Sequence, residues 1–203
     1  MVAFPRAFFD VDSVELAPLL LNKLIVRGER VGRIVEVEAY AGAADPASHA
    51  FRGPTARNAT MFGPPGHLYV YFTYGMHFCA NVVCGDEGEA SAVLLRGLTP
   101  LAGLDEMRAA RGVRRALASG RPDGEWTDQD LCSGPAKLCQ ALGLDRAFDG
   151  ADLVTGDRGV TVAGDGTPPP AEPGVSGRIG LSVAGELPWR YYVPGALGLS
   201  RRR

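Results

Sequence analysis

Residues 34–40 constrain the fold more than any other part of the sequence. They read IVEVEAY, so apolar and polar residues alternate with a period of two, which is typical of a half-buried strand. On one face, Val35, Val37 and Ala39 are expected to meet a core. The other face carries Glu36, Glu38 and Tyr40. Because unpaired carboxylates are seldom buried, that face is either a solvated sheet surface or one wall of a site for a polar aromatic ligand.

The chain length sets the scale of the fold. With 203 residues the chain can bury a sizeable core, and we expect one domain over residues 1–203. The 27 Gly and 15 Pro predict many turns and irregular connections rather than long helices. We expect no signal peptide and no membrane span, because the nearest apolar run, Leu19-Leu20-Leu21, is far too short. The four cysteines form no C-x-x-C pair, so we expect reduced core thiols and no metal site.

Charge gives a mixed indication about partners. A net charge of −2 and a pI near 5.9 disfavour a nucleic-acid partner if taken alone. The distribution is uneven, however, because acidic residues gather at 123–130 and 145–157. A one-sided basic surface is therefore possible, built from Arg52, Arg57 and a run that contains Arg108, Arg111, Arg114, Arg115 and Arg121.

The first half of the chain predicts one helix and two hairpins. An aromatic N-terminal arm precedes a helix that starts near Ser13 and contains Pro18, which would kink it outside the first turn. Residues 24–26 pair with the Glu38 strand, and residues 67–83 form a second hairpin with Tyr74 near its tip. Between the hairpins, residues 42–58 predict a loop that contains His49.

The second half predicts a further strand and several short elements. Residues 92–98 form a strand in which Arg96 shares a face with Leu94 and Leu98, and an Arg in such an apolar run normally has an acidic or phosphate partner. A helix start at residue 135 would present backbone N–H groups that suit a phosphate. The remaining predictions are a helix over 100–111, an exposed excursion over 110–130, a helix over 135–142 and short strands at 160–163, 178–181 and 190–193.

Seven motifs occur in an order that identifies a family. They are Glu36-Val37-Glu38-Ala39-Tyr40, Asp45-Pro46-Ala47-Ser48-His49, Arg57-Asn58, Tyr69-Val70-Tyr71-Phe72-Thr73-Tyr74-Gly75-Met76-His77, Asn81, Leu94-Leu95-Arg96 and Leu131-Cys132-Ser133-Gly134-Pro135-Ala136-Lys137-Leu138-Cys139-Gln140. With these motifs the chain resembles the alkyladenine (3-methyladenine) DNA glycosylases over residues 8–193. It does not resemble the helix-hairpin-helix glycosylases or those with a zinc finger.

The resemblance implies both a fold and an activity. The fold is α+β, a single compact domain with a curved antiparallel β-sheet, flanking helices and a protruding β-hairpin, similar to the C-terminal domain of methionyl-tRNA formyltransferase. The activity is hydrolysis of the N-glycosidic bond of alkylated or deaminated purines, such as 3-methyladenine, 7-methylguanine and hypoxanthine, in double-stranded DNA. We expect a cytoplasmic monomer, associated with the nucleoid when bound to DNA, with no membrane contact, metal or organic cofactor.

The resemblance also assigns roles to residues. Glu38 matches the general base, and Arg96 and the backbone carbonyl of Ile179 match groups that hold the attacking water. In the base pocket, Tyr40, His49 and Tyr71 enclose the flipped base and Asn81 obstructs the exocyclic amine of normal guanine. In the DNA interface, Tyr74 is inserted into the duplex, and Thr55, Arg57 and Lys137 fall at or near positions that touch the backbone.

Physical chemistry supports these roles independently. A base inside a duplex is unreachable, so it must be flipped out while a wedge residue fills the gap. An N-alkylated purine is cationic, and the faces of Tyr40 and Tyr71 attract a cation by about 0.5–2 kcal/mol. Such a base leaves readily, so a carboxylate that deprotonates water suffices, whereas a neutral base needs a proton and no second acid is obvious. We see no suitably placed amine nucleophile, so we expect an abasic product and no strand cleavage.

Some positions depart from the family pattern, and two other functions compete. Gly63-Pro64-Pro65 replaces a bulkier, more basic segment, and His77 stands where some members have Tyr. We also expect no long basic N-terminal extension, since the sequence starts at Met1. These differences concern DNA affinity and wedge geometry.

A non-catalytic binder of damaged bases or RNA would not need Glu38 together with Arg96. A hydrolase of free nucleosides would not need an exposed Tyr74.

Overall fold

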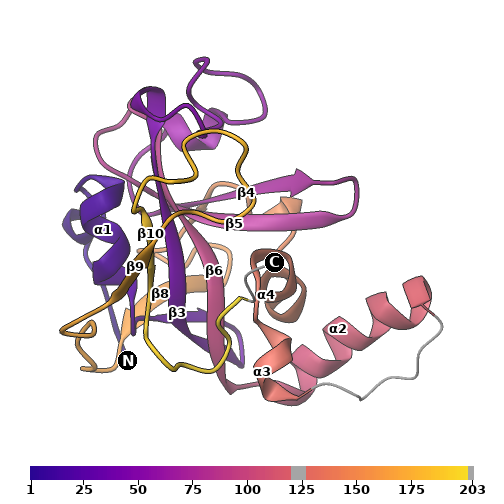
Figure 1. Ribbon diagram of the computed structural model, residues 1–203. Helices are drawn as coiled ribbons and strands as arrows, with labels where there is room; N and C mark the ends of the chain where they lie inside the picture. Colours follow the sequence, from indigo (N-terminus) through magenta and orange to yellow (C-terminus); the bar gives the residue numbers. More distant parts are fainter. Residues whose placement is uncertain (120–126, 201–203) are drawn as a thin grey trace.

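The computed structural model describes residues 1–119 and 127–200, and within this part of the chain the strands form one antiparallel sheet. The sheet order is β1-β8-β2-β3-β6-β5-β4-β7, and β10 pairs with both β3 and β9. Figure 1 shows the sheet curling around its core, with the β4–β5 hairpin extending to one side. The predicted α+β architecture around a curved antiparallel sheet is therefore confirmed.

The element bounds are as follows. The strands are β1 Val2–Ala3, β2 Leu24–Arg27, β3 Arg30–Ala41, β4 His67–Thr73, β5 His77–Cys84, β6 Ser91–Ala102, β7 Ala151–Asp152, β8 Val160–Gly164, β9 Gly174–Ser176 and β10 Arg190–Tyr192. The helices are α1 Ser13–Leu20, α2 Leu104–Ser119, α3 Asp128–Leu131 and α4 Pro135–Leu142, and short 3-10 turns cover Arg6–Phe8, Gly42–Ala44, Ala59–Phe62 and Arg146–Phe148. None of these helices is long and apolar enough to span a membrane.

One hydrophobic core joins the sheet to α1 and α4. Leu16 and Leu20 lie four residues apart on α1, and Leu138 and Leu142 have the same spacing on α4, so each pair occupies one helix face and is fully buried. α4 ends at Gly143, whose φ of 67° is left-handed and whose N–H caps the carbonyls of the last turn. The predicted helices at these two places and the buried, free state of the four cysteines are confirmed.

β3 is the strand on which the site is built. Its first half pairs with β2, its second half pairs with β10 on the same edge, and β6 covers the other edge. The β3–β6 register shifts three times, and at the two shifts that flank Glu36, Val35 on β3 and Arg96 on β6 have no residue opposite them. Such bulges turn side chains out of the regular alternation. They allow Ile34 and Val37 to enter the same core although their positions differ in parity.

The structure overturns two predictions about the faces of β3 and β6. Glu36 and Glu38 are fully buried, so the reading of this face as a solvated sheet surface is wrong. β10 and the segment after it cover that face. Val35 is buried but lies outside the main core cluster, and Leu98 lies in that cluster rather than beside Arg96. The alternating pattern could reveal neither the segments that cover the carboxylates nor the unpaired residues, Val35 and Arg96, that change which side chains share a face.

Two predicted elements are also wrong. The helix expected from Pro100 starts instead at Leu104, because β6 continues to Ala102 and tolerates Pro100 next to a register shift. The helix then runs to Ser119, beyond the predicted end. The strand expected at 178–181 is irregular, since the N–H of Ile179 donates to the Glu38 side chain instead of a neighbouring strand.

The predicted basic surface is only partly described. Arg108 forms ion pairs with Asp105 and Asp128, so its charge is compensated within the α2–α3 region. Arg111 is buried and donates to Gln140 on α4. The side chains of Arg114, Arg115 and Arg121 lie outside the described part of the structure, and a one-sided basic surface therefore stays a prediction.

Gly97 gives a test of how tightly the C-terminal segment packs on β6. A Cβ at this position would lie 2.5 Å from the carbonyl oxygen of Gly198 and 3.2 Å from the Cβ of Glu36. We expect Gly97→Ala to lower the free energy of unfolding in urea by about 1–3 kcal/mol, the usual cost of overpacking. Leu101→Ala on the same strand is the control, because Leu101 is 44% exposed and should cost less than about 0.5 kcal/mol. Equal stability of the two variants would contradict the packing.

Candidate active site

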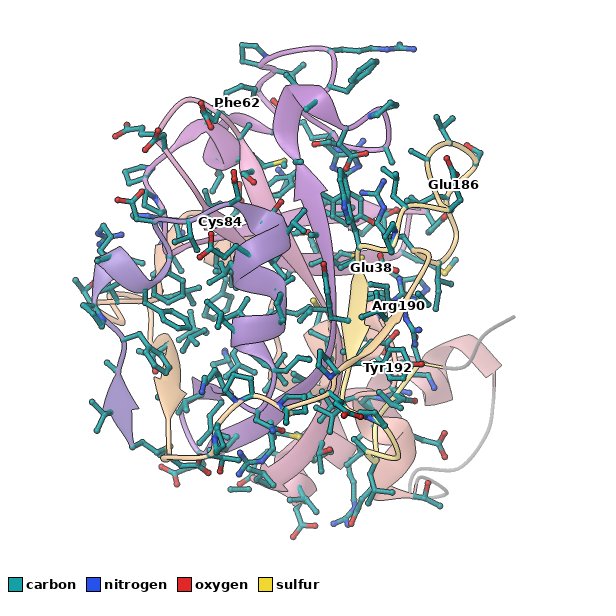
Figure 2. All side chains as sticks on the ribbon, turned by 60° about the vertical axis from the view of Figure 1, so that its left-hand side comes forward. Glu38, Phe62, Cys84, Glu186, Arg190 and Tyr192 are labelled. Carbon is teal, nitrogen blue, oxygen red and sulfur yellow. The ribbon has the colours of Figure 1, made fainter. Side chains whose placement is uncertain are left out.

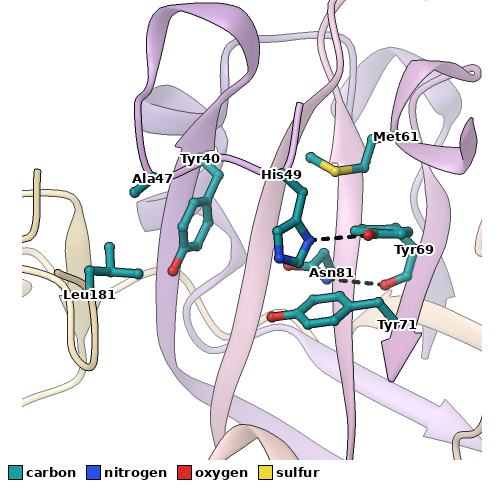
Figure 3. A pocket seen from close by; sticks show the side chains of 8 residues that line it. All are labelled: Tyr40, Ala47, His49, Met61, Tyr69, Tyr71, Asn81 and Leu181. Atoms are coloured by element: carbon teal, nitrogen blue, oxygen red, sulfur yellow. Dashed lines mark hydrogen bonds between the residues drawn. The ribbon is translucent and has the colours of Figure 1, made fainter. Parts of the chain in front are cut away.

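A pocket opens between the end of β3, the β4–β5 hairpin and the loop after β9 (Figure 3). Tyr40 projects from β3, Tyr69 and Tyr71 from β4, and Asn81 from β5, while the 42–58 loop brings in His49. The complete lining is Tyr40, Ala47, His49, Met61, Tyr69, Tyr71, Asn81 and Leu181. The structure thus brings together all four residues that the sequence predicted for a base pocket.

The pocket walls are aromatic and closely spaced. The His49 and Tyr71 rings meet edge to face with centroids 4.5 Å apart, and Tyr69 stacks on Tyr71 at 5.4 Å. A hydrogen bond of 3.1 Å joins Nδ1 of His49 to the Tyr69 hydroxyl. On the pocket floor, Nδ2 of Asn81 donates to the backbone carbonyl of Tyr69. These contacts fix the rings in place before any ligand binds.

The pocket keeps its titratable groups uncharged. Burial lowers the pKa of His49, and the nearby positive charge of Arg57 lowers it further. Burial raises the pKa of Tyr69 to about 12, and it also raises the pKa of Tyr71 far above its ordinary value. At neutral pH the walls are therefore neutral rings and hydroxyls, which suits a flat and polarised ligand.

Glu38 lies fully buried next to Tyr40, beside the pocket. Its Oε1 accepts a 2.7 Å hydrogen bond from the backbone N–H of Ile179. Its Oε2 accepts from the Tyr40 hydroxyl at 3.0 Å and from Nη1 of Arg96 at 3.3 Å. The predicted catalytic residues are thus neighbours, although Ile179 approaches Glu38 through its N–H group.

Sequence reasoning missed a buried ion pair at the pocket. Both oxygens of Asp45 accept hydrogen bonds from Arg178, and both side chains are fully buried. The guanidinium carbon of Arg178 lies 4.7 Å from the ring centre of Tyr40 and 5.1 Å from that of Trp189. This pair holds the loop that carries Ile179. The rule that an Arg in an apolar run needs an acidic partner would have identified Arg178, had it been applied beyond Arg96.

The predicted DNA-contacting residues lie in two places. Tyr74, 84% exposed, sits at the tip of the β4–β5 hairpin with a left-handed φ of 50°. Thr55 and Arg57 belong to the loop above the pocket, and Arg57 donates to the carbonyl of Phe72 on the hairpin. Lys137 is on α4, where it donates to Ser133, and it does not line the pocket. A surface that includes all four residues is larger than the pocket itself.

No group of three or more His, Cys, Asp or Glu side chains is placed to hold a metal ion within residues 1–119 and 127–200. The site combines an aromatic pocket, a buried carboxylate beside it and an exposed Tyr on a protruding hairpin, and such a pocket suits a flat aromatic ligand.

Comparison with known proteins identifies the family. Residues 7–197 match the family model described as methylpurine-DNA glycosylase. The relatives named "Putative 3-methyladenine DNA glycosylase" include one from Burkholderia lata, 55% identical over 94% of this chain and 87% of its own length. Another, from Methanoculleus marisnigri, is 44% identical over 99% of this chain and its full length. The chain therefore belongs to the methylpurine-DNA glycosylase family, whose activity is that of an N-glycosylase in DNA repair.

The electrostatics of the pocket can be tested by titration of His49. We expect a pKa below the ordinary value of about 6.5, because burial disfavours the imidazolium. Arg57→Gln removes a repulsive positive charge, so the pKa should rise but remain below that value, since burial is the larger cause. NMR titration of the His49 ring protons measures both effects. Arg52→Gln in the same loop is the control, and an equal rise in both variants would contradict the assignment.

Proposed function

We propose that this protein is a monofunctional DNA glycosylase that flips alkylated or deaminated purines out of duplex DNA and hydrolyses their N-glycosidic bond with a water activated by Glu38. The observation that carries the proposal is the juxtaposition of the aromatic pocket and the buried Glu38 carboxylate. Stacking alone would require the rings but not a carboxylate held by Arg96 and Ile179.

Substrate selection follows from the neutral aromatic walls. A 3-methyladenine or 7-methylguanine base carries a positive charge, and the faces of Tyr40 and Tyr71 attract it by about 0.5–2 kcal/mol. Stacking adds about 1–3 kcal/mol for any base. Asn81 is fixed on the pocket floor, where it would meet the exocyclic amine of a normal guanine. Hypoxanthine fits the same walls but leaves less readily, so we expect slower release.

The chemistry needs one group that takes a proton and one site for water. Glu38 is the general base, and Arg96 and the carbonyl of Ile179 hold the water that attacks the anomeric carbon. The negative charge of Glu38 also stabilises the oxocarbenium-like sugar in the transition state. As the C–N bond breaks, its electrons leave with the base, which is neutral on release if it was cationic before.

The remaining properties concern the DNA and the product. An exposed Tyr74 at a hairpin tip has the position and shape of a wedge that enters the duplex from the minor groove. Thr55, Arg57 and Lys137 would contact the phosphate backbone. The pocket lining contains no lysine, so we expect an abasic site without strand cleavage. We infer a monomer that acts in the cytoplasm and associates with the nucleoid through DNA.

The primary test is release of free base from duplex DNA that carries 3-methyladenine or 7-methylguanine. Glu38→Gln should reduce the rate by at least about 10²–10⁴-fold, because it removes the general base, while binding to the damaged duplex persists. Single-turnover release and a gel-shift titration measure the two properties. Absence of release by the unchanged protein at moderate salt would refute the function, and normal release by the variant would refute the assignment of the base.

The wedge role is tested separately with Tyr74→Ala. The variant should bind damaged duplex more weakly by about 10-fold or more, since one stacked aromatic contributes about 1–3 kcal/mol. Its affinity for a free-base analogue, measured by calorimetry, should be unchanged because Tyr74 does not line the pocket. Val175→Ala removes another exposed apolar side chain and serves as the control. Equal losses for duplex and free base would exclude a wedge.

A further inference from the structure

Arg96 has three different acceptors for its three nitrogens. Its Nη1 donates to Glu38 at 3.3 Å, its Nε donates to Glu36 at 3.2 Å, and its Nη2 donates to the Ser200 hydroxyl at 3.3 Å. An Arg and a carboxylate pair most strongly through two parallel hydrogen bonds. Because two of its nitrogens are engaged elsewhere, Arg96 makes only one long hydrogen bond to Glu38.

Glu36 is the centre of this arrangement, and it has no role in the proposed function so far. Its Oε1 accepts hydrogen bonds from Nε of Arg96, from Nε of Arg190 at 2.7 Å and from the Ser200 hydroxyl at 2.7 Å. Its Oε2 accepts from the backbone N–H of Ser200 at 2.6 Å. Figure 2 shows Glu38 and Arg190 on the paired strands β3 and β10, so the network is continuous with the site.

The charges in this network balance. Glu36 and Glu38 carry two negative charges, and Arg96 and Arg190 carry two positive charges, with all four side chains buried. Since Arg190 compensates Glu36, Arg96 is not needed to neutralise both carboxylates. Ser200 reaches the network from the C-terminal segment, which is attached to β6 by a hydrogen bond from Thr99 to the carbonyl of Leu197. A residue far from the pocket in the sequence therefore contacts the partner of the proposed base.

We propose that Glu36 and Ser200 are positioning residues that hold Arg96 in a single contact with Glu38 and so prevent a closed, two-bond ion pair. A closed pair would stabilise the carboxylate and weaken it as a base for water. It would also occupy a second Arg96 nitrogen and leave fewer of its N–H groups for the water that the proposed function places beside Glu38. This inference rests on the proposed function for its effect on catalysis, but the placement of Arg96 can be measured without any activity.

Other groups that face Glu38 do not change this conclusion. From its own strand Tyr40 donates to it, and from the loop after β9 come the Ile179 N–H and the more distant charge of Arg178. Cys79 on β5 is close enough that the charge of Glu38 contributes to the raised pKa of its thiol. None of these contacts involves Ser200, so a change at Ser200 acts on Glu38 through Arg96.

The test uses the full-length protein with Ser200→Ala, which removes one hydroxyl near the end of the chain. Glu36→Gln is not used, because it would disturb the contacts of Arg96, Arg190 and Ser200 at the same time. Ser200→Thr keeps the hydroxyl and is the conservative variant. Thr99→Val is the matched control, because it removes a hydrogen bond to the C-terminal segment that involves neither Ser200 nor Arg96. Single-turnover release of 7-methylguanine is measured against pH, together with the NMR signals of the Arg96 guanidinium.

We expect Ser200→Ala to lower the plateau rate by about tenfold, the effect of losing one hydrogen bond to a charged group, and to move the acid limb to lower pH. Affinity for damaged duplex should change by less than about twofold. The Arg96 guanidinium signals should shift in Ser200→Ala but not in Thr99→Val, and Ser200→Thr should retain most of the rate.

Several outcomes would overturn the proposal. One is a Ser200→Ala variant whose rate profile and Arg96 signals match those of the unchanged protein. Another is an equal loss in Thr99→Val, which would mean that only general attachment of the tail matters. A shift of the acid limb to higher pH would show that the network pushes Arg96 toward Glu38 instead of restraining it. If the unchanged protein released no base, the proposed function would fail, and the Arg96 signals alone would decide the positioning role.

Discussion

Two carboxylates, Glu36 and Glu38, lie fully buried two residues apart on β3, and the rest of the site depends on how their charges are compensated. A buried ion without partners costs several kcal/mol, so each carboxylate must be surrounded by donors. Arg96 comes from β6 and Arg190 from β10, while Ile179 and Ser200 contribute backbone N–H groups from irregular segments. Four distant parts of the chain thus place hydrogen-bond donors next to β3, where they compensate the two buried charges.

The same requirement explains local features that would otherwise look like defects. The register shifts that flank Glu36 in the β3–β6 pairing free Arg96 from regular pairing, and its side chain contacts both carboxylates. The segment at 178–181 forms no strand because one of its N–H groups is committed to Glu38. The ion pair between Asp45 and Arg178 then anchors that segment next to the pocket. In the proposed function these irregularities place a base, its water and the flipped purine within one small volume.

The rigid pocket and the protruding hairpin tip differ in what their side chains contact. The pocket rings are fixed by mutual packing and by hydrogen bonds such as that between His49 and Tyr69, so little ordering is needed when a base enters. Tyr74 stands apart on the hairpin tip, where its exposed ring has no role within the isolated protein. Family membership gives a reason for that exposure, since a glycosylase must act on a base that begins inside a duplex.

The sequence by itself determined the α1 and α4 helices, the two hairpins and four of the residues that line the pocket, which are Tyr40, His49, Tyr71 and Asn81. Periodicity and turn residues are local properties, and the motifs lie in the segments that form the site, so both can be interpreted without coordinates. Only the tertiary structure decided that Glu36 and Glu38 are buried and that Arg178, Arg190 and Ser200 belong to their surroundings. Long-range packing decides the bulges, the continuation of β6 past Pro100 and the ion pairs between residues more than a hundred positions apart. Such packing produces no periodic pattern in the sequence.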